Sequence, residues 1–203
     1  MAEVPGTEGY ERHVPEFIRL SQALSFETVC ADFLGHLPEP PGRILDAGTG
    51  AGQNAAALAL MGHSVVAVEP LSAFLEAART TYAALDIRWI RDSLPLLERL
   101  PAQSGPFDFI LVDGVWHHLT EEERSRTLAR FSVLLREGGR CALSLRNGPP
   151  GMGTRVYPTR VRDTVQDAEQ TGFVCTYVNE NQPSLLPGKA SVSWARLVLE
   201  KVR

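Results

Sequence analysis

Cysteine and lysine are both scarce in this chain of 203 residues. The three cysteines, Cys30, Cys141 and Cys175, lie far apart and form no CxxC pair, which argues against a disulfide scaffold or a zinc knuckle and indicates a reducing compartment. Lys189 and Lys201 are the only lysines, so nearly all basic residues are arginine. Together with the many alanines, this preference is typical of GC-rich coding sequences and indicates a bacterial source.

The chain also has no long uninterrupted hydrophobic run. Its longest uncharged stretch, residues 47–68, is broken by Gly-Thr-Gly-Ala-Gly-Gln-Asn and again by Gly-His-Ser, so it does not predict a membrane span. The first nine residues have neither the basic nor the apolar region of a secretion signal. With 24 acidic against 20 basic residues the net charge is -4, which argues against a general nucleic-acid coat. We therefore expect a cytoplasmic protein without membrane association.

What the sequence does contain is an alternation of short apolar runs and helix-like segments. Hydrophobic residues make up 44% and charged residues 22%, a globular composition. The apolar runs occupy residues 43–46, 64–69, 87–90, 107–113 and 140–145, and helical spacing occupies residues 53–61, 71–84, 120–136 and 158–171. This alternation predicts βαβ units that build a doubly wound, mostly parallel α/β sheet.

The two ends of the chain depart from this pattern. Residues 10–37 carry helical spacing that stops at a proline cluster, residues 38–42, so residues 1–39 are expected to form a helical cap on a domain spanning 40–203. Near the other end, residues 172–178 and 191–199 read as strands joined by a polar loop, 179–190, with no helix between them. Such a hairpin makes the last strand antiparallel.

A glycine-rich turn after the first strand is the most informative segment. It contains Gly48, Gly50 and Gly52 and opens directly into an alanine-rich helix, so the backbone can approach a ligand and the helix N-terminus favours electronegative groups. Nicotinamide and flavin enzymes use Gly-x-Gly-x-x-Gly, whereas Gln53 stands at the third position here. Asp46, two residues before the turn, suits a cationic amino-acid group and would repel a pyrophosphate.

Acidic residues follow the next two strands as well. Glu69 ends the second strand, where an acid accepts hydrogen bonds from ribose hydroxyls in several nucleotide-binding folds. Asp92 follows the third strand, where it can accept from the exocyclic amine of adenine, while the backbone N–H of Ser93 donates to the ring. Because ligands of open α/β sheets bind at the carboxyl ends of the strands, these acids predict a nucleoside site.

These motifs, taken in order, resemble those of class I S-adenosylmethionine-dependent methyltransferases. The resemblance rests on residues 46–52, 66–70, 91–95, 107–113 and 134–140 and covers about residues 40–200. It implies a seven-stranded sheet in the order 3-2-1-4-5-7-6 with strand 7 antiparallel, and S-adenosylmethionine as the cofactor, with S-adenosylhomocysteine as its product.

The resemblance also implies roles for individual residues. The methionine part of the cofactor would face Asp46 and the turn from Gly48 to Gly52, which includes Thr49; Glu69 with Pro70 would hold the ribose, and Asp92 with Ser93 the adenine. The segment of Asp113, Gly114 and Trp116 would lie beside the sulfonium. Tyr10 or Phe17 would close over the cofactor, and Arg12 would reach its carboxylate.

The segment from Asp113 to Leu119 resembles that of small-molecule methyltransferases. Either His117 or His118 can serve as a general base, since histidine titrates near neutral pH. Alternatively one histidine packs at the start of the following helix, and alignment of donor and acceptor suffices for methyl transfer. Trp116 either walls the pocket or anchors the helix. The adjacent histidines point about 100° apart on a helix, so no metal site is expected.

An arginine cluster suggests the charge of the acceptor. No acidic residue occurs from Gly138 to Arg162, a stretch with five arginines, and Arg146 or Arg155 is expected to bind an anionic group of a small-molecule acceptor. No aromatic-rich basic groove accompanies them, so a nucleic-acid partner is not expected. Two other functions remain open, a nicotinamide-dependent oxidoreductase and a cofactor-binding module without turnover. The acceptor, the methylated atom and the oligomeric state are not predicted.

Overall fold

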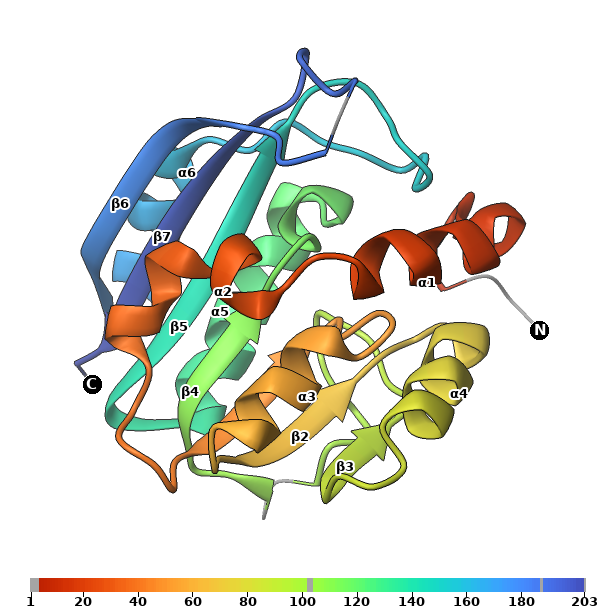
Figure 1. The fold of residues 1–203 in the computed structure, drawn as a ribbon. Coiled ribbons are helices and arrows are strands. Elements are labelled where there is room, and N and C mark those ends of the chain that lie inside the picture. Colours follow the sequence, from red (N-terminus) through yellow and green to blue (C-terminus); the bar gives the residue numbers. More distant parts are fainter. Residues whose placement is uncertain (1–3, 102–103, 187, 203) are drawn as a thin grey trace.

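A computed structural model of the chain describes residues 4–101, 104–186 and 188–202 (Figure 1). Seven strands form one sheet in the order β3-β2-β1-β4-β5-β7-β6. They are β1 (Arg43–Ala47), β2 (Ser64–Val68), β3 (Ile87–Ile90), β4 (Phe107–Val112), β5 (Leu135–Asn147), β6 (Phe173–Pro183) and β7 (Ser193–Lys201). Neighbours among β1 to β5 pair in parallel, and β7 is antiparallel to both β5 and β6. The predicted strand order and the antiparallel seventh strand are confirmed.

Helices cover both faces of the sheet. They are α1 (Val14–Gln22), α2 (Phe26–Val29), α3 (Gln53–Leu60), α4 (Ser72–Thr81), α5 (Glu121–Leu134) and α6 (Val161–Gln170), with 3-10 helices at Tyr10–His13, Ala31–His36 and Trp116–His118. In Figure 1, α2 and α3 lie in front of the sheet, and α5 and α6 lie behind it. Successive strand residues point to opposite faces, so Ile44 packs with α3 and Leu45 joins the core beneath α5.

Three predicted boundaries were wrong in detail. Residues 10–37 form four short helical segments instead of one run, because the chain turns at Ala23 and a new helix starts where the Ser25 side chain accepts from Thr28 N–H. The segment 179–183 belongs to β6 and not to the predicted loop, since Gln182 and Pro183 pair with β7 after a register shift. Helix α6 begins at Val161, three residues after the predicted start, because Arg160 is extended.

The N-terminal segment docks across the carboxyl edge of the sheet. The backbone N–H of Thr154 donates to the carbonyl of Glu8 at 2.8 Å, and the Tyr10 hydroxyl lies 3.0 Å from His118 Nε2. In Figure 1, α1 lies above α3 and α4, at the end toward which the parallel strands point. The segment therefore closes one side of the space above the strand ends.

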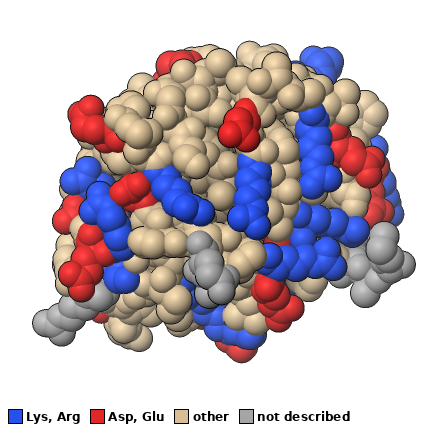
Figure 2. Space-filling model, turned by 90° about the horizontal axis from the view of Figure 1, so that it is seen from below, with Lys and Arg blue, Asp and Glu red and all other residues tan. Residues whose placement is uncertain are grey.

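The opposite edge of the sheet carries charges of both signs. Figure 2 views the molecule from below, toward the amino ends of the parallel strands, and shows Lys and Arg interspersed with Asp and Glu. Two arginines from β5 are paired, Arg136 with Asp108 and Arg140 with Glu200 at 3.0 Å. Among the helices that the structure describes, none is long and apolar enough to cross a membrane.

The turn between β1 and α3 requires glycine for two reasons. Gly48, Gly50 and Gly52 all have positive φ, a region that L side chains rarely adopt. In addition, a Cβ atom at Gly52 would lie 2.8 Å from both the Ala78 side chain and the Trp89 ring. The turn is thus pressed against α4 and β3 with no room for a side chain.

Replacing Gly52 by alanine should therefore destabilise the fold. Because Gly52→Ala introduces both φ strain and a steric clash, we expect the free energy of unfolding to fall by about 1–3 kcal/mol in urea titrations. Gly35→Ala is the matched control, since Gly35 has no positive φ and a Cβ there meets nothing within 4 Å. Equal stability of the two variants would contradict the strained geometry of the turn.

Candidate functional site

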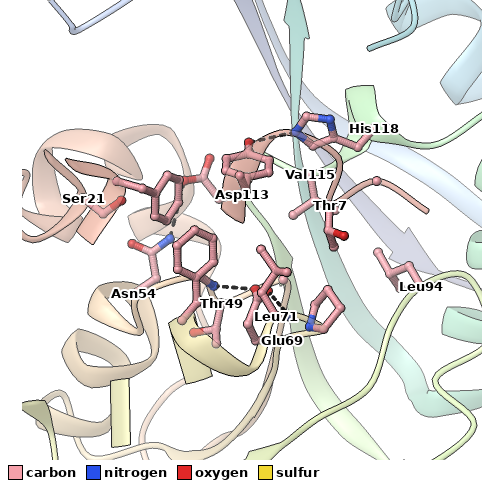
Figure 3. Close-up of a pocket in the computed structure, with 18 of the residues that line it drawn as sticks. Thr7, Ser21, Thr49, Asn54, Glu69, Leu71, Leu94, Asp113, Val115 and His118 are labelled. Atoms are coloured by element: carbon pink, nitrogen blue, oxygen red, sulfur yellow. Dashed lines mark hydrogen bonds between the residues drawn. The ribbon is translucent and has the colours of Figure 1, made fainter. Parts of the chain in front are cut away.

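A pocket of about 260 Å³ lies above the carboxyl ends of the parallel strands. Its wall is formed by the N-terminal segment, the glycine turn, the ends of β2, β3 and β4, and the β6–β7 connection. Of the residues predicted to bind ligands, Tyr10, Gly48, Thr49, Gly50, Glu69, Pro70, Asp92, Ser93, Asp113, Gly114 and His118 line it. In Figure 3, Thr49, Glu69 and Leu71 lie at the lower end of the pocket and His118 at the upper end.

Glu69 lies at the floor of the pocket and holds the glycine turn. Its Oε2 accepts from the Gly50 N–H at 3.0 Å and its Oε1 from the Leu71 N–H at 2.8 Å. The residue is only 5% exposed. Burial outweighs the two N–H donors and raises the pKa of Glu69 to about 7.

Asp46 lies beneath the same turn and does not line the pocket. The Thr49 hydroxyl donates to Asp46 Oδ2, which positions the threonine in the pocket wall. The carboxyl is almost fully buried, and this desolvation raises the pKa of Asp46 to about 7. Asp46 thus supports the turn from below instead of contacting a ligand, and Gly52, also predicted to bind, packs against α4.

Asp92 shapes the third part of the wall. Its Oδ1 accepts from Ser93 N–H, and its Oδ2 accepts from the N–H groups of Arg99 and Leu100 at 2.6 and 3.0 Å. These backbone donors engage both oxygens of Asp92, so the carboxylate holds residues 93–100 in place. Ser93 and Leu94 of this ordered segment line the pocket.

Two polar residues at the start of α3, Gln53 and Asn54, line the pocket. Asn54 Nδ2 lies 3.4 Å from Asp113 Oδ2, a contact drawn in Figure 3. Gln53 Oε1 and Asn54 Oδ1 are buried, and neither has a hydrogen-bond partner in the described part of the chain. Because both oxygens are closed off from solvent, they lie beneath the pocket surface, and their lack of a partner costs free energy.

Tyr10 and His118 form a hydrogen-bonded pair at the upper end. His118 Nδ1 lies 2.6 Å from the Arg155 carbonyl, which can only accept, so Nδ1 carries the proton. His118 Nε2 therefore accepts from the Tyr10 hydroxyl at 3.0 Å. Burial lowers the pKa of His118 and raises the pKa of Tyr10 to about 12, so both groups are neutral near pH 7.

Trp116 and His117 lie behind the pocket, contrary to the predicted ligand contacts. Trp116 is fully buried, and its Nε1 donates to the Thr164 hydroxyl on α6, so it anchors the 3-10 helix. His117 is buried among protein atoms against the ring of Trp194. Burial lowers the pKa of His117 to about 2. Of the two candidate bases, only His118 faces the pocket.

The three predicted arginines also lie outside the pocket wall. Arg12 is exposed to solvent. Arg146 donates to the Pro149 carbonyl at 2.7 Å, and Arg155 is bound by Glu123 at 3.1 Å and by the His118 carbonyl. These partners occupy the guanidinium of Arg155, so it holds the loop that orients His118.

Sequence reasoning missed several residues of the wall. Asn54, Phe74, Trp194 and Arg196 line the pocket although no motif pointed to them. Arg196 had one available signal, since it interrupts the apolar run from Trp194 to Leu199. Phe17, named as an alternative to Tyr10, stacks on Phe74 with ring centroids 4.4 Å apart and lies over Gly50.

Comparisons with known proteins show which proteins this chain is similar to. Residues 44–139 match the methyltransferase domain family. A protein-L-isoaspartate O-methyltransferase of Methylorubrum populi is 33% identical over 144 residues, which cover 70% of this chain and 63% of that protein. An uncharacterised methyltransferase of Anoxybacillus flavithermus is 30% identical over 131 residues, covering 64% and 56%. The chain thus spans about six-tenths of the length of these curated relatives.

Solved structures share the fold over nearly the whole chain. A TehB-like S-adenosylmethionine-dependent methyltransferase of Corynebacterium glutamicum has a TM-score of 0.68 at 21% identity, covering 95% of this chain and 97% of that one. The 1,6-didemethyltoxoflavin-N1-methyltransferase of Burkholderia thailandensis, solved with its acceptor and S-adenosylhomocysteine, has a TM-score of 0.68 at 19% identity, covering 100% and 92%. Residues 44–139 thus match the methyltransferase domain family, and the whole chain shares the fold of these S-adenosylmethionine-dependent methyltransferases.

The buried carboxyl of Asp46 should leave a measurable signature in stability. Because its folded pKa of about 7 lies above the unfolded value, the stability it contributes is complete below the unfolded pKa and is lost as pH rises through 7. Between about pH 5 and pH 8, the unfolding free energy of wild type should fall relative to Asp46→Asn by about 2–4 kcal/mol.

Urea unfolding of the ligand-free protein across this pH range measures the difference. Asn retains an acceptor for the Thr49 hydroxyl, so the substitution removes the titration and keeps the hydrogen bond. Asp86→Asn, at an exposed position, is the control and should follow wild type. A difference between wild type and Asp46→Asn that does not change with pH would contradict the assignment.

Proposed function

We propose that this protein transfers the methyl group of S-adenosylmethionine to a small-molecule acceptor. The observation that carries the proposal is the buried Glu69 carboxylate, bound to the glycine turn through Gly50 and facing the same pocket as Asp113 and His118. Residues 1–39 act in this proposal as a helical cap on a cofactor-binding domain of residues 40–203.

The residues present fit this cofactor. The turn from Gly48 to Gly50 leaves backbone close to the ligand, and the Asp113 carboxylate in the pocket wall suits an ammonium group with its several donors. Asp113 adds negative charge beside Asn54. We assign the ribose to Glu69 and the adenine to the segment of Asp92 and Ser93.

The same charges disfavour the nicotinamide alternative. A dinucleotide would bring a pyrophosphate close to Asp113, which lies beside Asn54 at the start of α3, and the two negative groups would repel each other. A binding module without turnover would bind the same cofactor but would not transfer its methyl group.

The chemistry divides between cofactor and protein. The bound cofactor supplies an electrophilic methyl group on a positively charged sulfur. The protein aligns the acceptor with that methyl group and excludes water, for which Phe17 covers the glycine turn and Tyr10 packs edge-on against Phe17. A proton released by a hydroxyl or amine acceptor passes to Tyr10 as Tyr10 gives its own proton to His118 Nε2, whose neutral form is ready to accept it.

A transfer assay with methyl-labelled S-adenosylmethionine tests the proposed function. Incubation with a bacterial extract separated into small-molecule, protein and nucleic-acid fractions should place label in the small-molecule fraction. Label in the protein or nucleic-acid fraction alone would reject a small-molecule acceptor. Binding of the cofactor without label in any fraction would favour the binding module.

Glu69 should contribute strongly to cofactor affinity. Glu69→Ala leaves the ribose hydroxyls without a charged acceptor and frees the Gly50 N–H, so S-adenosylhomocysteine should bind more weakly by about 1.5–3 kcal/mol in calorimetry. Glu76→Ala, at an exposed position of the neighbouring helix α4, is the control and should bind like wild type. Unchanged affinity of the Glu69 variant would remove the ribose assignment.

His118 should act on turnover more than on cofactor binding. With the acceptor from the labelling assay, His118→Gln should lower kcat by about 10²–10⁴ if proton removal limits the rate, and leave S-adenosylhomocysteine affinity within about twofold. Since burial lowers the pKa of His118, the wild-type rate should fall only below the usual histidine range, and the variant should lose this acidic limb. An unchanged kcat would show that alignment alone suffices.

A further inference from the structure

Arg196 is the one lysine or arginine among the described residues that line the pocket. It is 7% exposed and comes from β7, far along the sheet from the glycine turn. Within the described ranges, no carboxylate lies within ion-pair distance of Arg196. Its side chain makes one hydrogen bond there, from Nη1 to the carbonyl of the neighbouring Ala195 at 3.5 Å. A buried charge with so little compensation is costly unless a ligand supplies the partner.

The surroundings of Arg196 hold its guanidinium ready for such a ligand. Its Cζ lies over the Trp194 ring, 4.9 Å from the ring centre, where cation–π attraction holds the charge. Apart from the Nη1 contact, its N–H donors make no hydrogen bond within the described ranges. The His117 ring lies nearly perpendicular to the same Trp194 ring, with the ring centroids 6.2 Å apart. The aromatic ring therefore limits the positions that the arginine can take.

The strand order places Arg196 away from the proposed cofactor half. The proposed cofactor residues follow β1, β2, β3 and β4, whereas β7 lies two strands beyond β4 and three beyond β1. At the usual spacing of neighbouring strands, these separations are about 10 Å and about 14 Å. Arg196 thus lines the β7 side of the pocket, away from the residues assigned to the cofactor, and this side is available to an acceptor.

This half of the pocket is also apolar. Besides Trp194, it contains Leu185 and Leu186, which follow the end of β6, where Gln182 pairs with Trp194. One fixed cation in an apolar wall suits a molecule with an apolar body and one planar anionic group.

We propose that Arg196, stacked on Trp194, recognises the carboxylate of an apolar, carboxylate-bearing acceptor. The inference rests on the proposed function, because it assigns the acceptor half of the same pocket. It replaces Arg146 and Arg155 as the anion-binding residues, since neither of them lines this pocket. The two N–H groups at the guanidinium edge donate to the two carboxylate oxygens and fix the orientation of the acceptor.

Two probes of nearly equal shape test the inference. Benzoate and benzamide are titrated into the protein saturated with S-adenosylhomocysteine and into the free protein, and binding is followed by ligand-observed NMR. Benzoate should bind more tightly than benzamide by about tenfold or more, because only benzoate supplies a charged partner for the guanidinium. Arg196→Met should abolish this preference and leave S-adenosylhomocysteine affinity within about twofold.

Two further variants complete the test. Arg160→Met removes an exposed arginine and should keep the full preference for benzoate. Arg196→Lys keeps the charge but loses the planar fork, so it should bind benzoate more weakly than wild type and still prefer it over benzamide. If circular dichroism shows that Arg196→Met does not fold, the benzoate affinity of Arg196→Lys, compared with that of wild type, tests the role of Arg196.

Each contrary result has a distinct meaning. Equal binding of the two probes to wild type, or benzoate preference retained without Arg196, would overturn the inference. So would a loss of S-adenosylhomocysteine affinity in Arg196→Met, because Arg196 would then hold the cofactor carboxylate. Failure of wild type to bind S-adenosylhomocysteine would reject the proposed function, whereas benzoate preference in the free protein would still support an anion site at Arg196.

Discussion

The hydrogen bond from Gly50 N–H to the Glu69 carboxylate joins two strand ends that the sequence separates by a whole βα unit. It fixes the glycine turn against β2, and the second oxygen of Glu69 orders the entry to α4 through Leu71. The turn itself exists only because three glycines adopt positive φ and Gly52 packs against α4 and β3. The floor of the pocket therefore depends on one buried carboxylate and one strained turn.

The pocket has two electrostatically different halves. Carboxylates gather where β1, β2, β3 and β4 end, and burial raises the pKa of both Asp46 and Glu69 to about 7. A positively charged ligand would favour their ionised forms and so offset part of the cost of desolvation. The single guanidinium of Arg196 lies on the other side, next to Trp194. In this account a cationic donor and an anionic acceptor are drawn to opposite ends of one cavity.

Much of this arrangement could be predicted from sequence because it follows from local rules. Short apolar runs that alternate with helical segments predicted a mostly parallel α/β sheet, and the resemblance to class I methyltransferases implied the strand order. The glycine-rich turn and the acids at strand ends predicted the positions of Gly48, Glu69 and Asp92 in the wall. Helix breaks in the N-terminal segment were harder to predict, because residues 10–37 keep helical spacing across them. The end of β6 depended on pairing across a register shift, a tertiary contact without a local signal.

The positions and partners of the arginine and histidine side chains were the hardest to predict. His117 and His118 are adjacent in sequence, yet the 3-10 turn sends one behind Trp194 and the other toward Tyr10. Arg155 looked available for a ligand because Glu8 and Glu123, which neutralise it, are distant in the sequence. Arg196 looked like an ordinary strand residue, since nothing local shows that the described part of the chain gives it no carboxylate partner. Such pairings are set by the tertiary fold and not by spacing.

The central claim, that the pocket accommodates an S-adenosyl ligand, is tested most directly by calorimetric titration of wild-type protein with S-adenosylhomocysteine, with NAD as the control. The account predicts saturable binding of one S-adenosylhomocysteine per chain and no measurable binding of NAD. Absence of S-adenosylhomocysteine binding by folded protein, or equal binding of NAD, would contradict it.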